Sequence, residues 1–253
     1  MRLKTTVRSA YFRSAVFRRL LNGILRFATP SRGIRTGHLA YFDGDEALGP
    51  VQRDEALMLF SVIRVLCPRV VVEFGFGQGH SAFNFLQALD ATAVLHSFDW
   101  SDSAETIARR EFESYGNFIF HKKSQADFSS ADVEGKPVDL AFIDASHDLG
   151  LNIETFKRLA PCLSPEGLVA IHDTGVWRRR HFAPMHRAFA KQKPQDWLSP
   201  ELFQHQRDER EFVNWIISEN SGYSVIHFHS CNTVRHGLTF VAGTRKLLTV
   251  PAT

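Results

Sequence analysis

The chain has 253 residues, of which 44% are hydrophobic and 23% charged, a makeup typical of a globular protein with a substantial core. Its three cysteines, Cys67, Cys162 and Cys231, are too few and too scattered for a disulfide framework, so we expect a reducing compartment, by default the cytoplasm. No apolar run reaches the roughly 18 residues that span a bilayer, and no secretory signal follows Met1, which argues against a secreted or integral membrane protein.

The net charge of +3 is unevenly spread, because nine basic residues precede the first acidic residue, Asp43. Apolar residues recur between them at close to helical spacing over 1–27, which predicts a basic amphipathic helix. Such an arm could lie on an anionic membrane surface, act as a transit peptide, or dock on its own domain or on a twin subunit. Because the stretch before Pro50 is rich in glycine and proline, we expect an arm and loop over 1–49 and one domain over 50–253.

From residue 51 onward, helical and extended patterns alternate along the chain. The predicted helices span 51–66, 80–90, 101–116, 149–163 and 207–222. The predicted strands span 69–75, 93–100, 118–124, 138–146 and 168–174, the last entered through a turn at 164–167. Asp102 and Glu105 have the spacing of a capping box at the start of their helix. Five strands that alternate with helices indicate a parallel sheet covered by helices on both faces.

The alternation breaks after residue 174. The stretch that follows is polar and marked by prolines, and we expect an irregular insert over about 176–206. Two further strands are predicted over 223–230 and 237–243, and their connection is too short for a crossover helix. The expected fold is therefore α/β, with a mostly parallel seven-stranded sheet and an antiparallel hairpin at its edge.

The turn after the first strand, EFGFGQGH, places Gly75, Gly77 and Gly79 between a strand and a helix. This arrangement exposes backbone N–H groups and a helix N-terminus to a ligand. The spacing is G-x-G-x-G, with His80 where a dinucleotide fingerprint needs its third glycine, and no lysine follows as in a phosphate-binding loop. Glu73 at the mouth of the turn disfavours a pyrophosphate and favours a ligand with a cationic centre and hydroxyls.

These residues resemble the first motif of the class I methyltransferases, which use S-adenosylmethionine and have a Rossmann-like fold. The resemblance extends over roughly 51–243. Within it, 138–174 is similar to the small-molecule O-methyltransferase group that includes macrocin- and mycinamicin-type sugar methyltransferases, because one strand ends in I-D-x-x-H and the next in H-D. Two motifs in this order are far more specific than the glycine turn alone.

The resemblance implies S-adenosylmethionine as cofactor. The residues that it implies at the cofactor are Glu73, Gly75, Gly77, Ser81, Asp99, Ser124, Gln125 and Asp144. Asp99, at the end of the second strand, stands where this fold places the acceptor for the ribose hydroxyls, and a carboxylate can accept two such hydrogen bonds. Ser124 and Gln125 would flank the adenine.

At the reacting centre, methyl transfer from a sulfonium needs alignment and the removal of a proton from the acceptor. A hydroxyl is a very weak acid, so we expect a base and preferably Mg²⁺. Asp144 and Asp173 end adjacent strands and suit Mg²⁺, and His172 completes the candidate metal set, although imidazole is a softer ligand than Mg²⁺ prefers. His147 matches the position that mycinamicin-type relatives use as general base; the alternative is a histidine that caps the next helix.

The sequence thus predicts an S-adenosylmethionine-dependent O-methyltransferase for a small molecule or sugar, with acceptor specificity in the insert by analogy. Two alternatives stay open: a cofactor-binding subunit of the same fold that does not catalyse, and a membrane-surface or partner-binding protein that acts through its arm, including as a homo-oligomer. Nucleic acid is not an expected partner, because the positive charge lies in a tail and the catalytic tetrapeptide of amino-directed methyltransferases is absent.

Overall fold

The computed structural model describes residues 36–42, 51–175, 200–219, 222–229 and 237–243. The chain divides into two units, 1–38 and 39–253, and the elements below belong to the second, except that one short 3-10 helix begins at Gly37. Leu39 is buried in its core, ahead of the boundary expected near residue 50. The predicted amphipathic helix of the arm and most of the predicted insert lie outside the described residues. No helix within those residues is long and apolar enough to cross a membrane.

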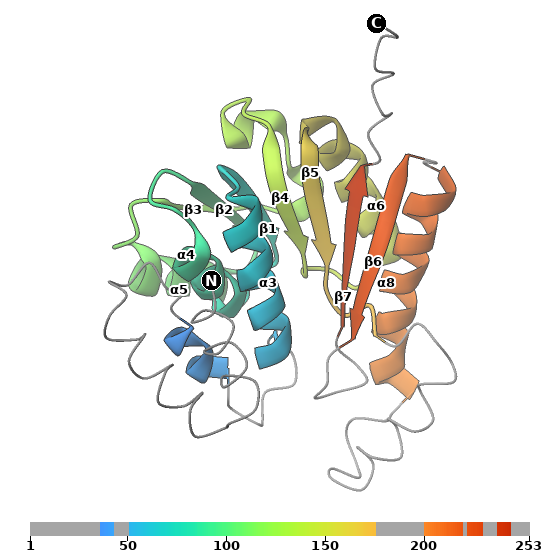
Figure 1. The fold of residues 1–253 in the computed structure, drawn as a ribbon, viewed down its shortest axis with the longest axis horizontal. Coiled ribbons are helices and arrows are strands. Elements are labelled where there is room, and N and C mark those ends of the chain that lie inside the picture. The colour runs from blue at the N-terminus through green and yellow to red at the C-terminus, as the bar shows by residue number, and fades with distance from the viewer. Residues whose placement is uncertain (1–35, 43–50, 176–199, 220–221, 230–236, 244–253) are drawn as a thin grey trace, which may run out of the picture. The chain divides into compact units, whose positions relative to one another are not determined.

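A seven-stranded sheet forms the centre of this unit (Figure 1). The strands are β1 (Val70–Phe74), β2 (Val94–Asp99), β3 (Phe118–Lys122), β4 (Val138–Ile143), β5 (Leu163–Ile171), β6 (Tyr223–His229) and β7 (Gly237–Gly243). Their order across the sheet is β3-β2-β1-β4-β5-β7-β6. Strands β1 to β5 pair in parallel, and β7 runs antiparallel to both β5 and β6. The predicted parallel sheet with an antiparallel hairpin at its edge is confirmed.

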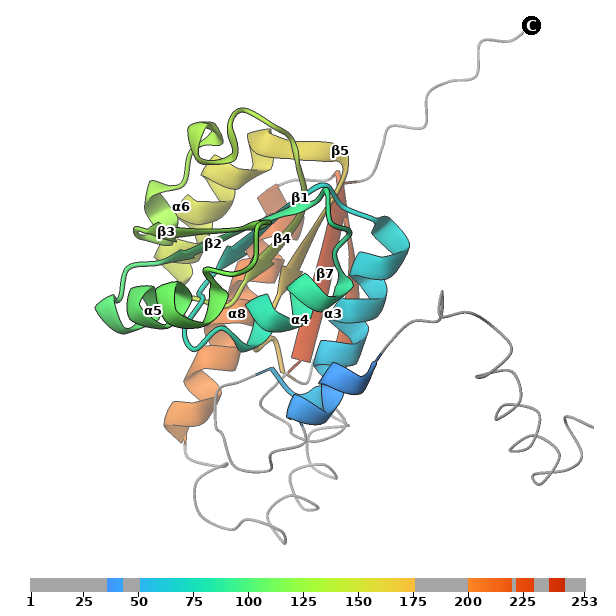
Figure 2. The same ribbon diagram turned by 90° about the vertical axis from the view of Figure 1, so that its left-hand side faces the viewer.

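Helices cover both faces of the sheet (Figure 2). One face carries α3 (Arg53–Leu66), α4 (His80–Ala88) and α5 (Asp102–Ile107), which a π-helix continues over Ala108–Phe112. The other face carries α6 (Leu149–Leu159) and α8 (Pro200–Glu219). Short 3-10 helices lie at Gly37–Phe42, Gln125–Asp127, Ser130–Val133 and Ala160–Cys162.

Strand β1 shows why the sheet needs both helical layers. All five of its residues are buried, and successive side chains enter opposite layers. Val71 packs in the cluster beneath α3 and α4, whereas Val72 and Phe74 pack in the cluster beneath α6 and α8. Each such side chain contributes roughly 1.5–3 kcal/mol when it leaves water, so the central strands hold both layers in place.

The starts of two elements differ from the prediction. Strand β5 begins at Leu163, and the residues expected to form a turn at 164–167 instead form a bulge, since Val138 pairs with Leu163 and Leu140 already pairs with Leu168. The last long helix begins at Pro200, so 200–206 is helical and not part of an irregular insert. Proline is favoured at the first position of a helix, where its missing N–H removes no hydrogen bond.

The capping box predicted for α5 is wrong. Ser101 is the N-cap, and its Oγ accepts a hydrogen bond from the Ala104 N–H at 3.1 Å. Asp102 and Glu105 instead form ion pairs with Lys122 on the neighbouring strand β3. Serine and aspartate are equally good caps, and here the residue one position earlier takes the role.

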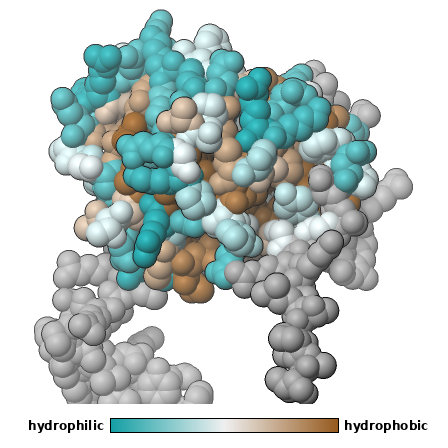
Figure 3. All heavy atoms as spheres, turned by 90° about the horizontal axis from the view of Figure 1, so that it is seen from above, coloured by the Kyte–Doolittle hydropathy of each residue, from teal (hydrophilic) through white to brown (hydrophobic). Residues whose placement is uncertain are grey.

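The two edges of the sheet differ in what they present. Figure 3 views the edge at which β4 and β5 begin, where hydrophilic residues cover much of the surface and hydrophobic ones lie between them. At the opposite edge, where the parallel strands end, the connections surround a cavity. That edge holds the residues whose chemistry the sequence singled out.

Candidate active site

A cavity of about 610 Å³ lies at the carboxyl ends of the parallel strands. The chain runs outward from β1 to β3 and then returns to β4 on the other side of β1, so the strand order reverses between β1 and β4. In open α/β sheets ligands bind at such a reversal, because the loops that follow the two strands diverge. Gly75 follows β1, Asp144 follows β4, and both line the cavity.

The glycine turn lets the backbone of β1 approach the backbone of β4 closely. Gly75, Gly77 and Gly79 all have positive φ, at 97°, 54° and 83°, which side chains rarely adopt. A Cβ on Gly75 would lie 2.2 Å from the carbonyl oxygen of Asp144, and one on Gly79 would lie 2.7 Å from the ring of Phe112. The turn therefore presents bare backbone to the cavity at the start of α4.

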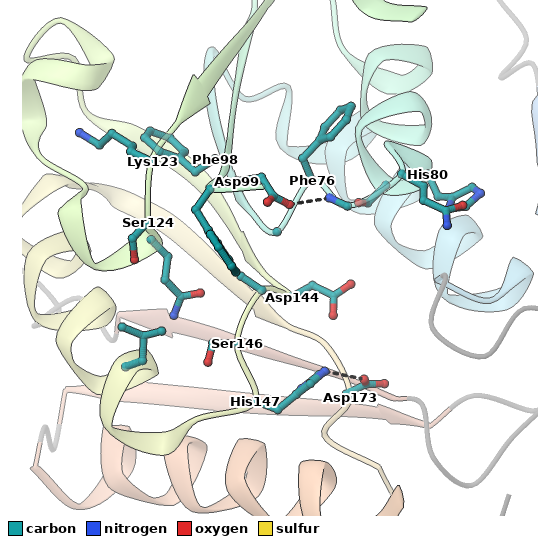
Figure 4. A pocket seen from close by; sticks show the side chains of 18 of the residues that line it. Phe76, His80, Phe98, Asp99, Lys123, Ser124, Asp144, Ser146, His147 and Asp173 are labelled. Atoms are coloured by element: carbon teal, nitrogen blue, oxygen red, sulfur yellow. Dashed lines mark hydrogen bonds and ion pairs between the residues drawn. The ribbon is translucent and has the colours of Figure 1, made fainter. Parts of the chain in front are cut away.

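Asp99, the last residue of β2, has a carboxylate that two backbone donors hold in place. Its Oδ2 accepts a hydrogen bond from the Gly77 N–H at 2.9 Å, and its Oδ1 accepts one from the Ser101 N–H at 2.9 Å. Each oxygen keeps a second lone pair, so the fixed carboxylate can accept further hydrogen bonds from hydroxyl groups in the cavity. Figure 4 shows Asp99 and Ser124 away from His147 and Asp173, which lie together.

Glu73 does not reach the cavity, in contrast to the expected direct contact with a ligand. It is fully buried in β1, and its two carboxylate oxygens accept hydrogen bonds from the hydroxyls of Ser81 and Ser97. Burial raises the pKa of Glu73 to about 7, against the lowering effect of both hydroxyls and with a further rise from Asp144 and Asp99. Glu73 therefore joins β1, β2 and α4 behind the turn, while Ser81 lines the cavity.

Ser124 and Gln125 line the cavity just after β3. The Oγ of Ser124 accepts a hydrogen bond from the Ala126 N–H at 3.3 Å and caps a short 3-10 helix. Gln125 is 5% exposed, and its Nε2 donates to Asn152 Oδ1 at 2.9 Å. Its buried Oε1 has no hydrogen-bond partner among the described residues, so this oxygen suits an amino group of a ligand.

His172, which follows β5, lies between two carboxylates. Its Nδ1 is 3.0 Å from Asp144 Oδ1, and its Nε2 is 3.1 Å from Glu55 Oε2 in the first turn of α3. Carboxylates only accept, so both ring nitrogens carry protons and the ring is an imidazolium. Burial acts to lower the pKa of His172, but Asp144, Asp173 and Glu55 outweigh it and hold the pKa well above its ordinary value.

The three predicted metal ligands do come together, since one ligand atom of each of Asp144, His172 and Asp173 lies within 4.8 Å of the others. An imidazolium, however, has no lone pair for a metal, and its positive charge lies beside both aspartates. A divalent cation held by all three residues would have to displace the proton on Nδ1 and the hydrogen bond to Asp144. As arranged, these residues do not fit such a cation, and His172 itself supplies the positive charge between the carboxylates.

Asp173 has an unusual backbone conformation, with a φ of 55°. For a residue other than glycine, this left-handed conformation costs about 1–2 kcal/mol, and such strain is often found at functional sites. The side chain is 3% exposed, and its Oδ2 lies 3.9 Å from His147 Nε2. The strained residue thus sets a carboxylate beside the candidate base, as Figure 4 shows.

His147 lines the cavity with 28% of its side chain exposed. Its Nδ1 is 3.1 Å from Oε1 of Glu209 on α8. Burial acts to lower the pKa of His147, but the hydrogen bond and charge of Glu209, together with the nearby aspartates, raise it above its ordinary value. His147 does not cap α6, because the carboxylate of Asp148 does so by accepting a hydrogen bond from the Leu151 N–H at 2.7 Å.

The sequence of this site is similar to that of known proteins. Residues 72–174, which include the glycine turn, Asp99 and the aspartates after β4 and β5, match a family model described as "Methyltransferase domain". The matched segment is therefore similar to methyltransferase domains, over 103 of the 253 residues. A curated relative, an uncharacterised protein y4gI of Sinorhizobium fredii, is 28% identical over 137 residues, which are 46% of this chain and 15% of that protein. The chain therefore spans only a small part of that relative.

Solved structures share the fold of this chain. The O-methyltransferase TomG from Streptomyces achromogenes, solved in complex with SAM, is 17% identical at a TM-score of 0.54, over 83% of this chain and 87% of TomG. A putative caffeoyl-CoA O-methyltransferase from Staphylococcus aureus is 17% identical at a TM-score of 0.60, over 89% and 98% of the two chains. At these identities the likeness establishes the fold, and the expected class I methyltransferase architecture is confirmed.

The site also contains residues that the sequence did not single out. Those that line the cavity are Val51, Phe76, Gln78, His80, Phe98, Trp100, Lys123, Ala145, Ser146 and Leu151. Glu55 and Glu209 lie buried behind it. One signal could have revealed Glu209, since it shares a helical face with the buried Phe212, Val213 and Ile216.

Proposed function

We propose that this chain is an S-adenosylmethionine-dependent O-methyltransferase whose acceptor is a hydroxyl of a small molecule or a sugar. One observation carries the proposal: a single cavity has the fixed carboxylate of Asp99 on one side and the carboxylate-bound His147 on another. The family match and the two O-methyltransferase structures support the reaction class. The hydroxyl acceptor is inferred from the presence of a base beside the cavity.

The charge of the cavity favours this cofactor over a dinucleotide. Three carboxylates, those of Asp99, Asp144 and Asp173, line it together with one lysine, Lys123, whose ammonium pairs with Asp132. Such a wall attracts a ligand with sulfonium and ammonium groups and repels a pyrophosphate. When bound, S-adenosylmethionine supplies a methyl group that its sulfonium has already activated.

The residues present fit the parts of this cofactor. Asp99 would accept hydrogen bonds from the ribose hydroxyls, and the Oε1 of Gln125 would accept one from the adenine amino group. Asp144 would face the amino-acid part, beside the bare backbone of Gly75 and Gly77. A cavity of about 610 Å³ lies within the range of protein sites for ligands of this size.

His147 is the proposed general base. Because Nδ1 bears the proton that is donated to Glu209, the lone pair lies on Nε2, on the side of Asp173. As the acceptor oxygen takes the methyl group, its proton passes to Nε2, and the ring becomes an imidazolium between Glu209 and Asp173.

The test separates binding from turnover. S-Adenosylhomocysteine should bind the wild-type chain and the His147→Ala variant equally well in calorimetric titrations. Production of S-adenosylhomocysteine from S-adenosylmethionine, measured with a panel of hydroxylated small molecules and sugars, should fall roughly 10²–10⁴-fold in the variant. Unchanged turnover would exclude His147 as the base. Binding without transfer to any hydroxyl would instead support the non-catalytic subunit.

A further inference from the structure

Glu209 is buried where α8 meets the end of the cavity. It is 4% exposed, and its Oε1 is 3.1 Å from His147 Nδ1. Phe212, Val213 and Ile216, on the same face of α8, are fully buried in the core beneath the helix. The core packing of α8 thus fixes the place of the carboxylate, and burial raises the pKa of Glu209 to about 6, although the bond to His147 acts to lower it.

A chain of side-chain amides leads to the same carboxylate oxygen. Gln125 Nε2 donates to Asn152 Oδ1 at 2.9 Å, which leaves the Nδ2 of Asn152 as a donor toward the other side. That Nδ2 donates to the backbone oxygen of Ser146 at 2.9 Å and lies 3.5 Å from Glu209 Oε1. All these contacts are at least partly buried, so the oxygen faces donors from Asn152 and His147 together.

The geometry selects one form of the neutral His147 ring. A carboxylate oxygen can only accept, so the nitrogen that faces Glu209 must carry the proton. The lone pair then lies on Nε2. Among the residues that the structure describes, the charged groups that face this ring are Glu209 from α8, Asp173 from the end of β5 and Asp144 from the end of β4. Without Glu209, Asp173 would be the carboxylate nearest to the ring, and it would attract the proton to Nε2, where the lone pair is needed.

We propose that Glu209 is the positioning residue of His147: it holds the proton on Nδ1 and so directs the Nε2 lone pair into the cavity. Asn152, which accepts a hydrogen bond from Gln125, places its Nδ2 beside the same oxygen of Glu209. The inference rests on the proposed function, because positioning matters only if His147 removes a proton. It extends that function by a residue on α8, outside the segment that matches the methyltransferase family.

The test uses the full chain labelled with ¹⁵N-histidine, in which long-range ¹H–¹⁵N NMR spectra report the tautomer of each ring. The signals of His147 are assigned by their loss in His147→Ala. The wild type and Glu209→Gln, which keeps an oxygen acceptor, should show the proton on Nδ1 of His147. Glu209→Leu should lose that form. Glu211→Gln, on the same helix, is the matched control and should match the wild type.

Turnover provides the second readout. In Glu209→Leu, kcat should fall roughly 10–100-fold while KM for S-adenosylmethionine stays unchanged, and Glu209→Gln should recover most of the loss. Thermal unfolding checks that each variant is folded. If Glu209→Leu does not fold, Glu209→Gln still tests the proposal, because a changed His147 tautomer in that variant would overturn it. A Glu209→Leu protein with wild-type tautomer and kcat would also overturn it. If the tautomer shifts as expected but no hydroxyl is methylated, the proposed function fails, whereas the effect of Glu209 on the His147 tautomer stands.

Discussion

Replacing Gly75 by alanine should destabilise the fold far more than the same change at Gly77. Both residues have positive φ, and an alanine there costs about 1–2 kcal/mol. At Gly77 the new methyl group would meet nothing within 4 Å. At Gly75 it would lie 2.2 Å and 2.6 Å from the carbonyl O and C of Asp144 and 2.7 Å from Cα of Ala145, all backbone atoms that cannot rotate away.

Relief of that clash must separate the end of β1 from the end of β4. Two backbone hydrogen bonds of 2.9 Å hold this end of β1: Asp144 N–H donates to Phe74 O and joins it to β4, and Gly75 N–H donates to Phe98 O and joins it to β2. A buried donor or acceptor left without its partner costs about 1–3 kcal/mol, so the loss of these bonds adds several kcal/mol to the backbone term. We therefore expect Gly75→Ala to cost at least about 4 kcal/mol, against about 1–2 kcal/mol for Gly77→Ala.

Thermal unfolding of the two variants, followed by circular dichroism, measures the difference. In a domain of this size each kcal/mol lowers Tm by about 2–4 °C, so Tm should fall by at least about 8 °C in Gly75→Ala and by about 2–8 °C in Gly77→Ala. Gly77→Ala is the matched control, because it adds the same atom in the same turn. Equal decreases in Tm would refute the close approach of β1 and β4 as the reason for glycine at 75.

Three further predictions concern buried charges. The pKa of Glu73 is raised to about 7 in the folded state, because burial favours the protonated side chain. Its contribution to stability is therefore complete below the unfolded pKa near 4.5 and is lost as the pH rises through 7. The free energy of unfolding of Glu73→Gln and of the wild type should be measured in urea at pH 5 and at pH 8. From pH 5 to pH 8 the variant should gain about 2–3 kcal/mol relative to the wild type. A difference that does not change with pH would contradict the burial of a titrating carboxyl group. Glu55→Ala should lower the free energy of unfolding by about 3–5 kcal/mol, because His172 loses one of its carboxylate partners. The control is Glu154→Ala, at an exposed ion pair, which should leave Tm unchanged. Similar decreases in Tm for the two variants would contradict the buried pair. Treatment with EDTA should alter neither S-adenosylhomocysteine binding nor methyl transfer, and activity that returns only with added Mg²⁺ would show that His172 does not replace a metal.

The sequence was sufficient for the fold and for the edge that carries the site. Strands that alternate with helices imply a parallel sheet, and the carboxyl ends of parallel strands share one edge. Asp99 ends β2, Asp144 and His147 follow β4, and Asp173 follows β5, so their meeting around one cavity could be inferred without coordinates. The hairpin followed in the same way from the short connection between the last two strands.

The direction of individual side chains could not be inferred in this way. Glu73 seemed exposed to a ligand because it precedes the glycine turn, but the register of β1 with β2 sets it opposite Ser97, under the start of α4. His172 looked like a metal ligand because nothing in the sequence places Glu55, 117 positions earlier, at its other nitrogen. Such contacts depend on how α3 and α8 pack across the ends of the strands.

Calorimetric titration of the full chain with S-adenosylhomocysteine tests the central claim most directly. One site should be filled per chain, and Asp99→Asn, which removes the charge but keeps the size of the side chain, should weaken binding at least about tenfold, or about 1.4 kcal/mol. Saturating ligand should also raise Tm, because it binds only the folded state. A titration without heat, together with an unchanged Tm, would contradict the assignment of this cavity to S-adenosylmethionine.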